Sequence, residues 1–308
     1  MDEMRGLHMN TEKIKNDLKE IKLLFNEPLS NFTYTKTGGP ADCLLFPKSI
    51  AEVKHIVDYC NEENINWLCL GNASNLIVKD GGIEGFVIML TELNEVIIND
   101  TFVTADAGAK LIEVTKMARD EKLTGLEFAC GIPGSIGGAA YMNAGAYGGE
   151  LVDVFHSAEI LLADGSLVTY KNEDMNFSYR HSVLQELKGI VLNVTFALEK
   201  GNLSDIQTKM DELTFLRESK QPLEYPSCGS VFKRPEGHFT GKLIQDANLQ
   251  GLKWGGAQIS TKHAGFIVNI DNATATDYVE LIKHIQETIL KEFDVVLETE
   301  VRIIGREK

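Results

Sequence analysis

The stretch that most constrains the fold is 125–150, GLEFACGIPGSIGGAAYMNAGAYGGE. It holds eight of the chain's 27 glycines, with small residues between them and only two charged side chains. Glycine lets the backbone reach positive φ and approach a ligand closely, at an entropic cost that an ordinary loop has no reason to accept. Because successive free N–H groups form a concave anion site, residues 134–139 are typical of a wrap around a phosphate or pyrophosphate. A structural glycine loop is an equally good interpretation at this point.

The glycine stretch matches neither of the two common phosphate motifs. No Gly-Lys-Ser/Thr follows it, and the spacing Gly131-x-x-Gly134-x-x-Gly137 is not G-x-G-x-x-G. A second polar turn, 71–75 (GNASN), separates two expected strands and adds Asn and Ser donors to those of its backbone. Taken alone it is more typical of a hairpin turn. Together, the two loops favour the binding of one pyrophosphate group between them.

Composition restricts the class of partner. A net charge of −15 argues against nucleic acid and anionic membranes. Five scattered cysteines without C-x-x-C indicate reduced thiols in a cytoplasmic protein rather than disulfides or a zinc site. The histidines form no H-x-H or H-E-x-x-H pattern, so we expect no metal. No apolar run approaches 18 residues, so we expect no membrane insertion.

The periodicity predicts an α+β chain whose clearest boundary lies near residue 200. We expect an N-terminal helical segment (1–32), a mixed-sheet domain (33–200) and a smaller α/β sandwich (201–308). Residues 1–8 are expected to be a leader before a natural start at Met9. Helices are predicted at 12–22, after the capping box Ser49-x-x-Glu52, and at 111–120, 204–218 and 276–292. Strands are predicted at 32–39, 67–70, 76–78, 86–90, 96–98, 102–105, 158–162, 167–170 and 190–198.

Four polar groupings could carry chemistry, and each also has an ordinary structural interpretation. Tyr179-Arg180 could simply face solvent. Arg217-x-x-Lys220 ends a helix, where cations favour the dipole, but the pair could also meet a phosphate. Residues 227–232 place small side chains on a turn that enters a strand. In a strand, residues 298, 300 and 302 would share one face, which an exposed salt-bridged surface explains as well as a site does.

Seven motifs, in order from about residue 33 to 305, resemble the UDP-N-acetylenolpyruvoylglucosamine reductases (MurB), a family of bacterial peptidoglycan synthesis. They are TKTGG (35–39), GNASN (71–75), GIPGSIGGAAYMNAGAYGGE (131–150), Tyr179-Arg180, GSVFKRP (229–235), GKLIQDANLQG (241–251) and LETEVRIIG (297–305). The short chain between Tyr179 and residue 201 resembles the second, shorter type of this family.

The resemblance implies an FAD-binding domain of the vanillyl-alcohol-oxidase/PCMH type and a C-terminal α/β sandwich substrate domain. FAD would meet the two predicted anion loops, with the segment 143–149 lining the flavin side. NADPH would reduce the flavin and leave before the sugar nucleotide enters. The cofactor-binding positions carried over are Thr37, Gly38, Gly71, Asn72, Ala73, Ser74, Asn75, Gly131, Ile132, Pro133, Gly134, Ser135, Gly137, Gly138, Ala139, Asn143, Ala146 and Gly148.

By the same resemblance, Ser230 corresponds to the proton donor, and Arg180 and Glu300 to its catalytic companions. Arg180 can stabilise negative charge beside the substrate carboxylate in a dry site, and a general acid must protonate the α-carbon. Glu300 could assist through hydrogen bonding or act as an alternative acid. The substrate-binding positions carried over are Tyr147, Tyr179, Arg217, Lys220 and His263.

One position departs from the pattern of the family. Ala73 stands where glycine is common in the 71–75 loop, and we expect its backbone to adopt an ordinary conformation.

The resemblance implies NADPH-dependent, FAD-mediated reduction of UDP-N-acetylglucosamine enolpyruvate to UDP-N-acetylmuramate, the activity of a UDP-N-acetylmuramate dehydrogenase. Its partners would be small molecules, a UDP-sugar above all, with no obligate protein partner. Two alternatives are an FAD-dependent oxidase of the same fold and a non-catalytic sugar-nucleotide binder. The substrate-domain motifs disfavour the oxidase. The joint presence of Ser230, Arg180 and Glu300 disfavours the binder, which needs no proton donor.

Overall fold

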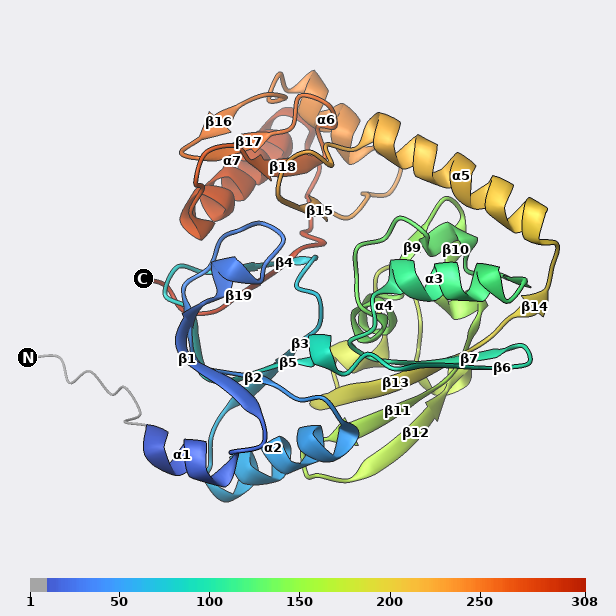
Figure 1. Ribbon diagram of the computed structural model, residues 1–308. Helices are drawn as coiled ribbons and strands as arrows, with labels where there is room; N and C mark the ends of the chain where they lie inside the picture. The colour runs from blue at the N-terminus through green and yellow to red at the C-terminus, as the bar shows by residue number, and fades with distance from the viewer. Residues whose placement is uncertain (1–9) are drawn as a thin grey trace, which may run out of the picture.

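The first layer is a four-stranded sheet in the order β1-β2-β5-β3, seen in the computed structural model, which describes residues 10–308 (Figure 1). Its strands are β1 (Lys22–Pro28), β2 (Pro40–Phe46), β5 (Ile83–Met89) and β3 (Trp67–Leu70). Helices α1 (Thr11–Asp17) and α2 (Ile50–Glu62) pack on this sheet through a shared apolar core. Ser49 caps α2 by accepting from the amide of Glu52, as the sequence predicts. The expected leader, residues 1–8, lies outside the described residues.

The second layer is an antiparallel sheet in the order β12-β11-β13-β7-β6. Its strands are β6 (Val96–Asn99), β7 (Phe102–Asp106), β11 (Phe155–Leu162), β12 (Leu167–Lys171) and β13 (Gly189–Ala197). Helices α3 (Leu111–Asp120) and α4 (Ile136–Met142) lie over it in Figure 1, with α4 against β13 and β7. The short pairs are β8 (Leu123–Thr124) with β14 (Glu199–Lys200), and β9 (Gly145–Ala146) with β10 (Gly149–Glu150).

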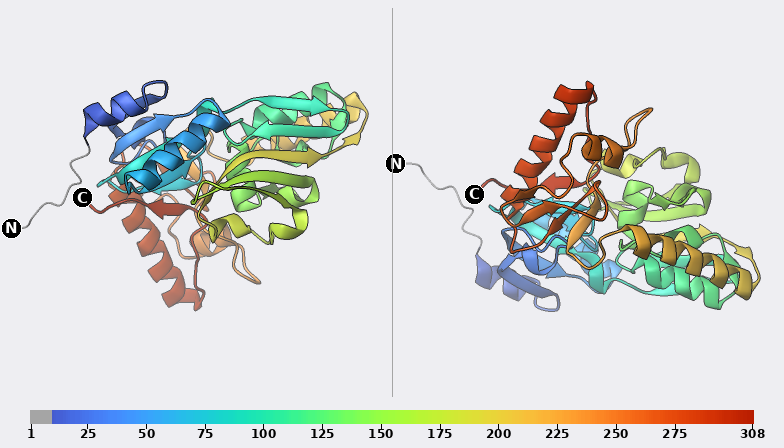
Figure 2. Two further views of the ribbon diagram at one scale, coloured as in Figure 1. Left: turned by 90° about the horizontal axis from the view of Figure 1, so that it is seen from below. Right: turned by 90° about the horizontal axis from the view of Figure 1, so that it is seen from above.

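The third layer is a separate sheet-and-helix unit formed by the last third of the chain (Figure 2). Its sheet has the order β15-β18-β17-β16. The strands are β15 (Ser227–Ser230), β16 (Lys253–Trp254), β17 (Ala257–Ile259) and β18 (Phe266–Asn269), covered by α6 (Thr240–Asp246) and α7 (Ala275–Phe293). Within residues 10–308 no helix, α7 included, combines the length and apolarity that a membrane crossing needs.

Two segments join this unit to the rest of the chain. Helix α5 (Leu203–Lys220) begins just after the predicted boundary, and it buries Ile206, Met210 and Leu213 against Cys130 of the glycine stretch. The strand β19 (Arg302–Ile304) returns to pair in parallel with β4 (Leu76–Val78), directly after the 71–75 loop. Residues 201–220 and 302–304 therefore contact the first two layers rather than the third alone.

One predicted helix is too long and two predicted strands are absent. Helix α1 ends at Asp17, and residues 22–28 form β1, a strand of the first sheet, instead of continuing a helix. Residues 32–39 form no strand, because Lys36 and Gly38 have positive φ and the threonine hydroxyls bond to each other, Thr35 Oγ1 to Thr37 Oγ1 at 2.9 Å. Residues 298–301 lie before β19 and form no strand. Residues 298 and 300 therefore do not share a strand face with Arg302.

Candidate active site

The two loops predicted to grip an anion lie against each other. The side-chain amide of Asn72 donates to the carbonyl of Pro133 at 2.7 Å. A Cβ placed on Gly71 would lie 2.0 Å from the hydroxyl of Ser135, so only glycine permits this approach. Gly137 is similarly tight, with a Cβ there 2.9 Å from that of Ala107. The predicted pairing of 71–75 with 131–139 is thus present in the structure.

Both loops present backbone donors that the described chain leaves unused. Within residues 10–308, the amides of residues 72–75 and those of Gly134 and Ser135 donate no hydrogen bond. Ser135 caps α4, accepting from the amide of Gly138 at 3.3 Å, and is itself buried. Several free amides lie close together here, and glycine occupies the point where the two loops come closest. This arrangement fits the binding of the FAD pyrophosphate.

Ala73 contradicts one expectation. Its φ is +48°, a left-handed conformation and not the ordinary one predicted for an alanine in this loop. The surrounding contacts hold it there: Ala73 is buried, and its carbonyl accepts from the amide of Tyr34 at 3.2 Å. Through this bond and that of Asn72 to the Tyr34 hydroxyl, at 2.9 Å, the segment carrying Thr37 and Gly38 joins the two loops.

Asn143 ends α4 in a left-handed conformation and is fully buried. Its side chain accepts from the amide of Val152 and donates to the Glu150 carboxylate and to the Ser178 carbonyl, at 3.0–3.1 Å. These bonds fix the β9–β10 hairpin, which contains Ala146 and Gly148. At the tip of this hairpin, Tyr147 has φ +54° and is 45% exposed.

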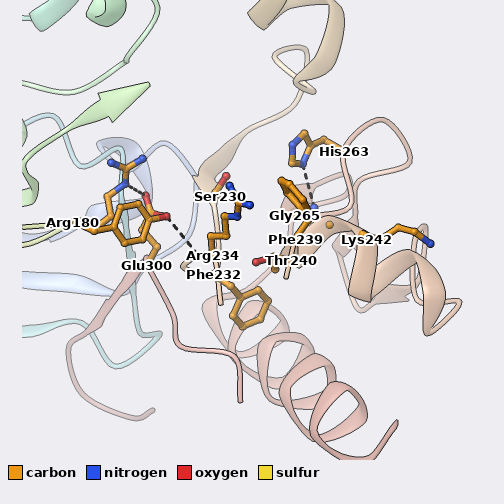
Figure 3. A pocket seen from close by; sticks show the side chains of 12 residues that line it. Arg180, Ser230, Phe232, Arg234, Phe239, Thr240, Lys242, His263, Gly265 and Glu300 are labelled. Atoms are coloured by element: carbon orange, nitrogen blue, oxygen red, sulfur yellow. Dashed lines mark hydrogen bonds and ion pairs between the residues drawn. The ribbon is translucent and has the colours of Figure 1, made fainter. Parts of the chain in front are cut away.

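Arg180, Ser230 and Glu300 line one cavity of ≈ 320 Å³ where the third layer meets the rest of the chain (Figure 3). The Nε of Arg180 donates to a Glu300 carboxylate oxygen at 2.9 Å, and its Nη2 donates to the carbonyl of Gly145 at 2.9 Å. Figure 3 shows this pair on one side of the cavity, His263 on the other, and Ser230 between them.

Ser230 owes its position to an irregularity in β15. Gly229 before it has φ +77°, and the register against β18 shifts between Ser227 and Ser230. Such a bulge redirects a side chain at the edge of a strand. The sequence signal was the group of small residues within 227–232, which overlaps GSVFKRP, and the structure places the Ser230 side chain in the cavity.

Burial sets the electrostatics of the site. Desolvation raises the pKa of Glu300, although the neighbouring Arg180 guanidinium opposes this by lowering it. Burial lowers the pKa of His263, and its Nδ1 accepts from the amide of Gly265 at 3.1 Å, so the neutral ring keeps its proton on Nε2. Desolvation raises the pKa of Cys228 to about 12, which leaves an inert thiol two residues from Ser230.

The other predicted substrate residues divide between two places. Tyr179 and His263 line the cavity. Arg217 instead lies beside the glycine loop: a Cβ on Gly131 would come within 2.6 Å of its Cδ, and desolvation lowers the pKa of its guanidinium. Lys220 is exposed at the last turn of α5, and Tyr147 stays at its hairpin tip. These three do not line the cavity that holds Ser230.

Sequence reasoning missed a second set of residues that line the same cavity. The Arg234 guanidinium lies 3.9 Å from the ring centroid of Phe239, and both line the cavity with Phe232, Thr240 and Lys242. All five lie between Val231 and Lys242, in the connection from β15 to α6 or in the first turn of α6. The motifs GSVFKRP and GKLIQDANLQG contain three of these residues, but in the sequence they indicated only the family and not a position in the cavity.

Fold and site together define an FAD-dependent oxidoreductase. The sequence profile of an FAD binding domain matches residues 41–171, which contain both loops. The profile of the UDP-N-acetylenolpyruvoylglucosamine reductase C-terminal domain matches residues 221–304, which contain Ser230, His263 and Glu300.

Similar proteins identify the family. The chain is 69% identical to the UDP-N-acetylenolpyruvoylglucosamine reductase of Enterococcus faecalis, over 97% of this chain and 100% of that protein. It is 58% identical to that of Limosilactobacillus reuteri, over 96% and 99%. The crystal structure of the reductase (MurB) from Thermus caldophilus superimposes with a TM-score of 0.78 at 34% identity, over 92% and 98%. The chain belongs to the UDP-N-acetylenolpyruvoylglucosamine reductase family.

Proposed function

We propose that the chain carries out the reaction of its family with Arg180, Ser230 and Glu300 as catalytic residues. It is a UDP-N-acetylmuramate dehydrogenase, which uses FAD and NADPH to reduce UDP-N-acetylglucosamine enolpyruvate to UDP-N-acetylmuramate for peptidoglycan. The convergence of these three side chains on one cavity supports the assignment of residues. Family membership favours this reaction over the oxidase and over the non-catalytic binder.

The loops 71–75 and 131–139 are proposed to hold the FAD pyrophosphate, with Arg217 as a nearby cation. FAD, when bound, supplies the two-electron carrier between NADPH and the enolpyruvyl double bond. The free amides and the glycine contacts of the two loops support this placement. Arg217 fits as well, because a desolvated guanidinium beside such a loop is stabilised by an anion.

Arg180 is proposed to stabilise the negative charge that hydride addition at the β-carbon leaves next to the substrate carboxylate. The bonds to Glu300 and to the Gly145 carbonyl fix its guanidinium beforehand, which is the condition for electrostatic catalysis. Ser230 is proposed to give the α-carbon its proton. Glu300, ionised beside Arg180, orients the guanidinium in this scheme.

The first test is Ser230→Ala, with Ser227→Ala in the same strand as its control. Purified Ser230→Ala enzyme should be yellow, and anaerobic NADPH should bleach its flavin at a rate close to that of the wild type. Reoxidation by the enolpyruvyl substrate should then slow by at least about a hundredfold, the size of a general-acid contribution. A variant that reoxidises like the wild type would rule out Ser230 as the donor. Reduced wild-type enzyme that recovers only in air would point to the oxidase.

We further propose a cytoplasmic enzyme that works on small molecules, with a UDP-sugar as substrate. Two observations support this. The five cysteines are free thiols, as expected in a reducing compartment. The net charge of −15 disfavours polyanionic partners such as nucleic acid.

A further inference from the structure

Arg180 occupies a backbone conformation that its side chain does not favour. Ser178 and His181 exchange two backbone hydrogen bonds around the two-residue turn Tyr179-Arg180, at 3.2 and 3.1 Å. Arg180, the second residue of this turn, has φ +56°. Glycine or asparagine is usual at such a position, and a non-glycine residue persists there only when its surroundings hold it in place.

The side chain of Gln185 bonds directly to the backbone of Arg180. The Nε2 of Gln185 donates to the carbonyl of Arg180 at 2.9 Å and to the carbonyl of Tyr141 at 3.0 Å. Within residues 10–308, no other group donates to the Arg180 carbonyl. Tyr141 lies in the last turn of α4, the helix that the glycine loop begins, so Gln185 ties the turn of Arg180 to the proposed cofactor loop.

The same amide also reaches the segment that carries Glu300. The Oε1 of Gln185 accepts a long hydrogen bond, 3.4 Å, from Nη1 of Arg302, two residues after Glu300. Gln185 therefore touches both chain segments whose side chains form the Arg180–Glu300 ion pair. Its neighbour Ser182, buried, donates to the same Tyr141 carbonyl at 2.9 Å and helps to fix the end of α4.

We infer that Gln185 is a positioning residue for the reduction step: its amide holds Arg180 in the left-handed turn from which the guanidinium reaches both Gly145 and Glu300. This rests on the catalytic role proposed above for Arg180. Without Gln185, the turn relaxes to a more ordinary conformation and the guanidinium leaves its two partners. The charge that develops on the substrate then loses its stabilising cation.

The test uses full-length holoenzyme with Gln185→Leu, which keeps the volume of the side chain and removes every polar contact. Gln185→Glu is the second variant, since it loses the bonds donated to Arg180, Tyr141 and Met142 but can still accept from Arg302. Gln207→Leu is the matched control, because Gln207 on α5 is half-buried like Gln185 and is bonded to Arg119 and Asp211. Arg180→Ala is measured alongside. Each half-reaction is followed by stopped-flow absorbance of the flavin, first with NADPH and then with the enolpyruvyl substrate.

In both Gln185 variants, we expect NADPH to reduce the flavin at a rate within about twofold of the wild-type rate. The enolpyruvyl substrate should then reoxidise that flavin at least tenfold more slowly than in the wild type. The pH profile of reoxidation should move as well. Arg180 and Lys233 both lower the pKa of Glu300, Arg180 more strongly, and the buried thiol of Cys228 lies close to the same carboxylate. Displacing Arg180 raises that pKa, so the acid limb of the profile should shift to higher pH. A purely structural role would lower the melting temperature without moving this limb.

The outcomes separate the two proposals. If Arg180→Ala reoxidises slowly while both Gln185 variants match Gln207→Leu in rate and pH profile, the inference about Gln185 is wrong and the role of Arg180 stands. If the flavin of Arg180→Ala is reoxidised at the wild-type rate, the proposed catalytic role of Arg180 is wrong, and the inference about Gln185 is wrong with it. If Gln185→Leu loses FAD or unfolds, the same two measurements on Gln185→Glu, the rate of flavin reoxidation and its pH profile, test the inference.

Discussion

At the scale of single residues, four of the predicted site positions other than glycine have positive φ: Ala73, Asn143, Tyr147 and Arg180. Asparagine adopts this conformation more readily than the other three. Strain of this kind is kept where the surrounding structure and the function require it. The sequence does not predict positive φ at alanine, tyrosine or arginine, because these residues occur mostly in helices, strands and loops with negative φ. This is why the conformation expected for Ala73 was wrong.

Glu300 offers a direct test of charge at this scale. Burial raises the pKa of its carboxyl above the ordinary value, so it loses its charge, and its ion pair with Arg180, at a higher pH than an exposed glutamate would. The rate of flavin reoxidation by the substrate should therefore fall as pH decreases through that pKa. Glu300→Gln should be slower at pH 8 and should lack this acid limb, as stopped-flow measurements from pH 5 to 9 would show.

The matched control is Glu298→Gln, since Glu298 is largely exposed and forms an ion pair with Lys233. It should keep the acid limb of the wild type. A rate that instead falls as pH rises, with the Glu300 variant abolishing that alkaline limb, would make Glu300 the proton donor in place of Ser230.

At the scale of elements, the sequence predicted those whose local signals agree with their packing. Strands β3 and β4 and helix α3 have the predicted bounds, and α7 begins one residue before the predicted start at 276, behind a capping box formed by Thr274 and Asp277. The failures lie where tertiary contacts decide. Residues 22–28 become a strand because β2 is available as a partner, and 32–39 turn inward around buried threonine hydroxyls. Arg234 and Phe239 were missed because only the fold brings their loop to the cavity.

The start of α7 also depends on a distant carboxylate. Asp80 accepts from the amides of Ala275 and Thr276, at 3.0 and 2.9 Å, and from the Thr276 hydroxyl at 2.6 Å. Desolvation alone would raise the pKa of Asp80, but the bonds from Thr276 and Ala275 outweigh it and lower that pKa. The stabilisation is then complete above the pKa of an unfolded aspartate, about 4, and is lost as pH falls through the folded value.

We expect Asp80→Ala to reduce the free energy of unfolding by about 1–2 kcal/mol at pH 7, the range for loss of a helix cap. The difference from the wild type should shrink as the pH approaches 3, because protonation removes the same interaction from the native protein. Denaturant melts at several pH values measure this. Asp58→Ala, which removes a half-exposed ion pair with Lys54, should cost about 0.5 kcal/mol or less. An equal loss at every pH would contradict the proposed cap.

At the scale of the whole molecule, the two loops leave a set of backbone donors whose natural partner is the cofactor. Binding to the native state alone stabilises it by mass action, about 2.7 kcal/mol at a free ligand concentration one hundred times Kd. FAD added to apoprotein should therefore raise the melting temperature in a concentration-dependent way. Riboflavin, which lacks the pyrophosphate, should raise it far less at equal concentration. Equal shifts for the two ligands would mean that the loops do not grip the pyrophosphate.

The pairing of β19 with β4 has a consequence for how the enzyme is made. Asn75 of the proposed FAD loop donates to the carbonyl of Glu300, and its own carbonyl accepts from the amide of Arg302. Because Asn75 and Glu300 lie 225 residues apart in the sequence, the ribosome completes the loop long before it reaches the strand that supports it. We therefore expect a nascent chain that stops before β19 to lack a completed cofactor site and to retain FAD poorly.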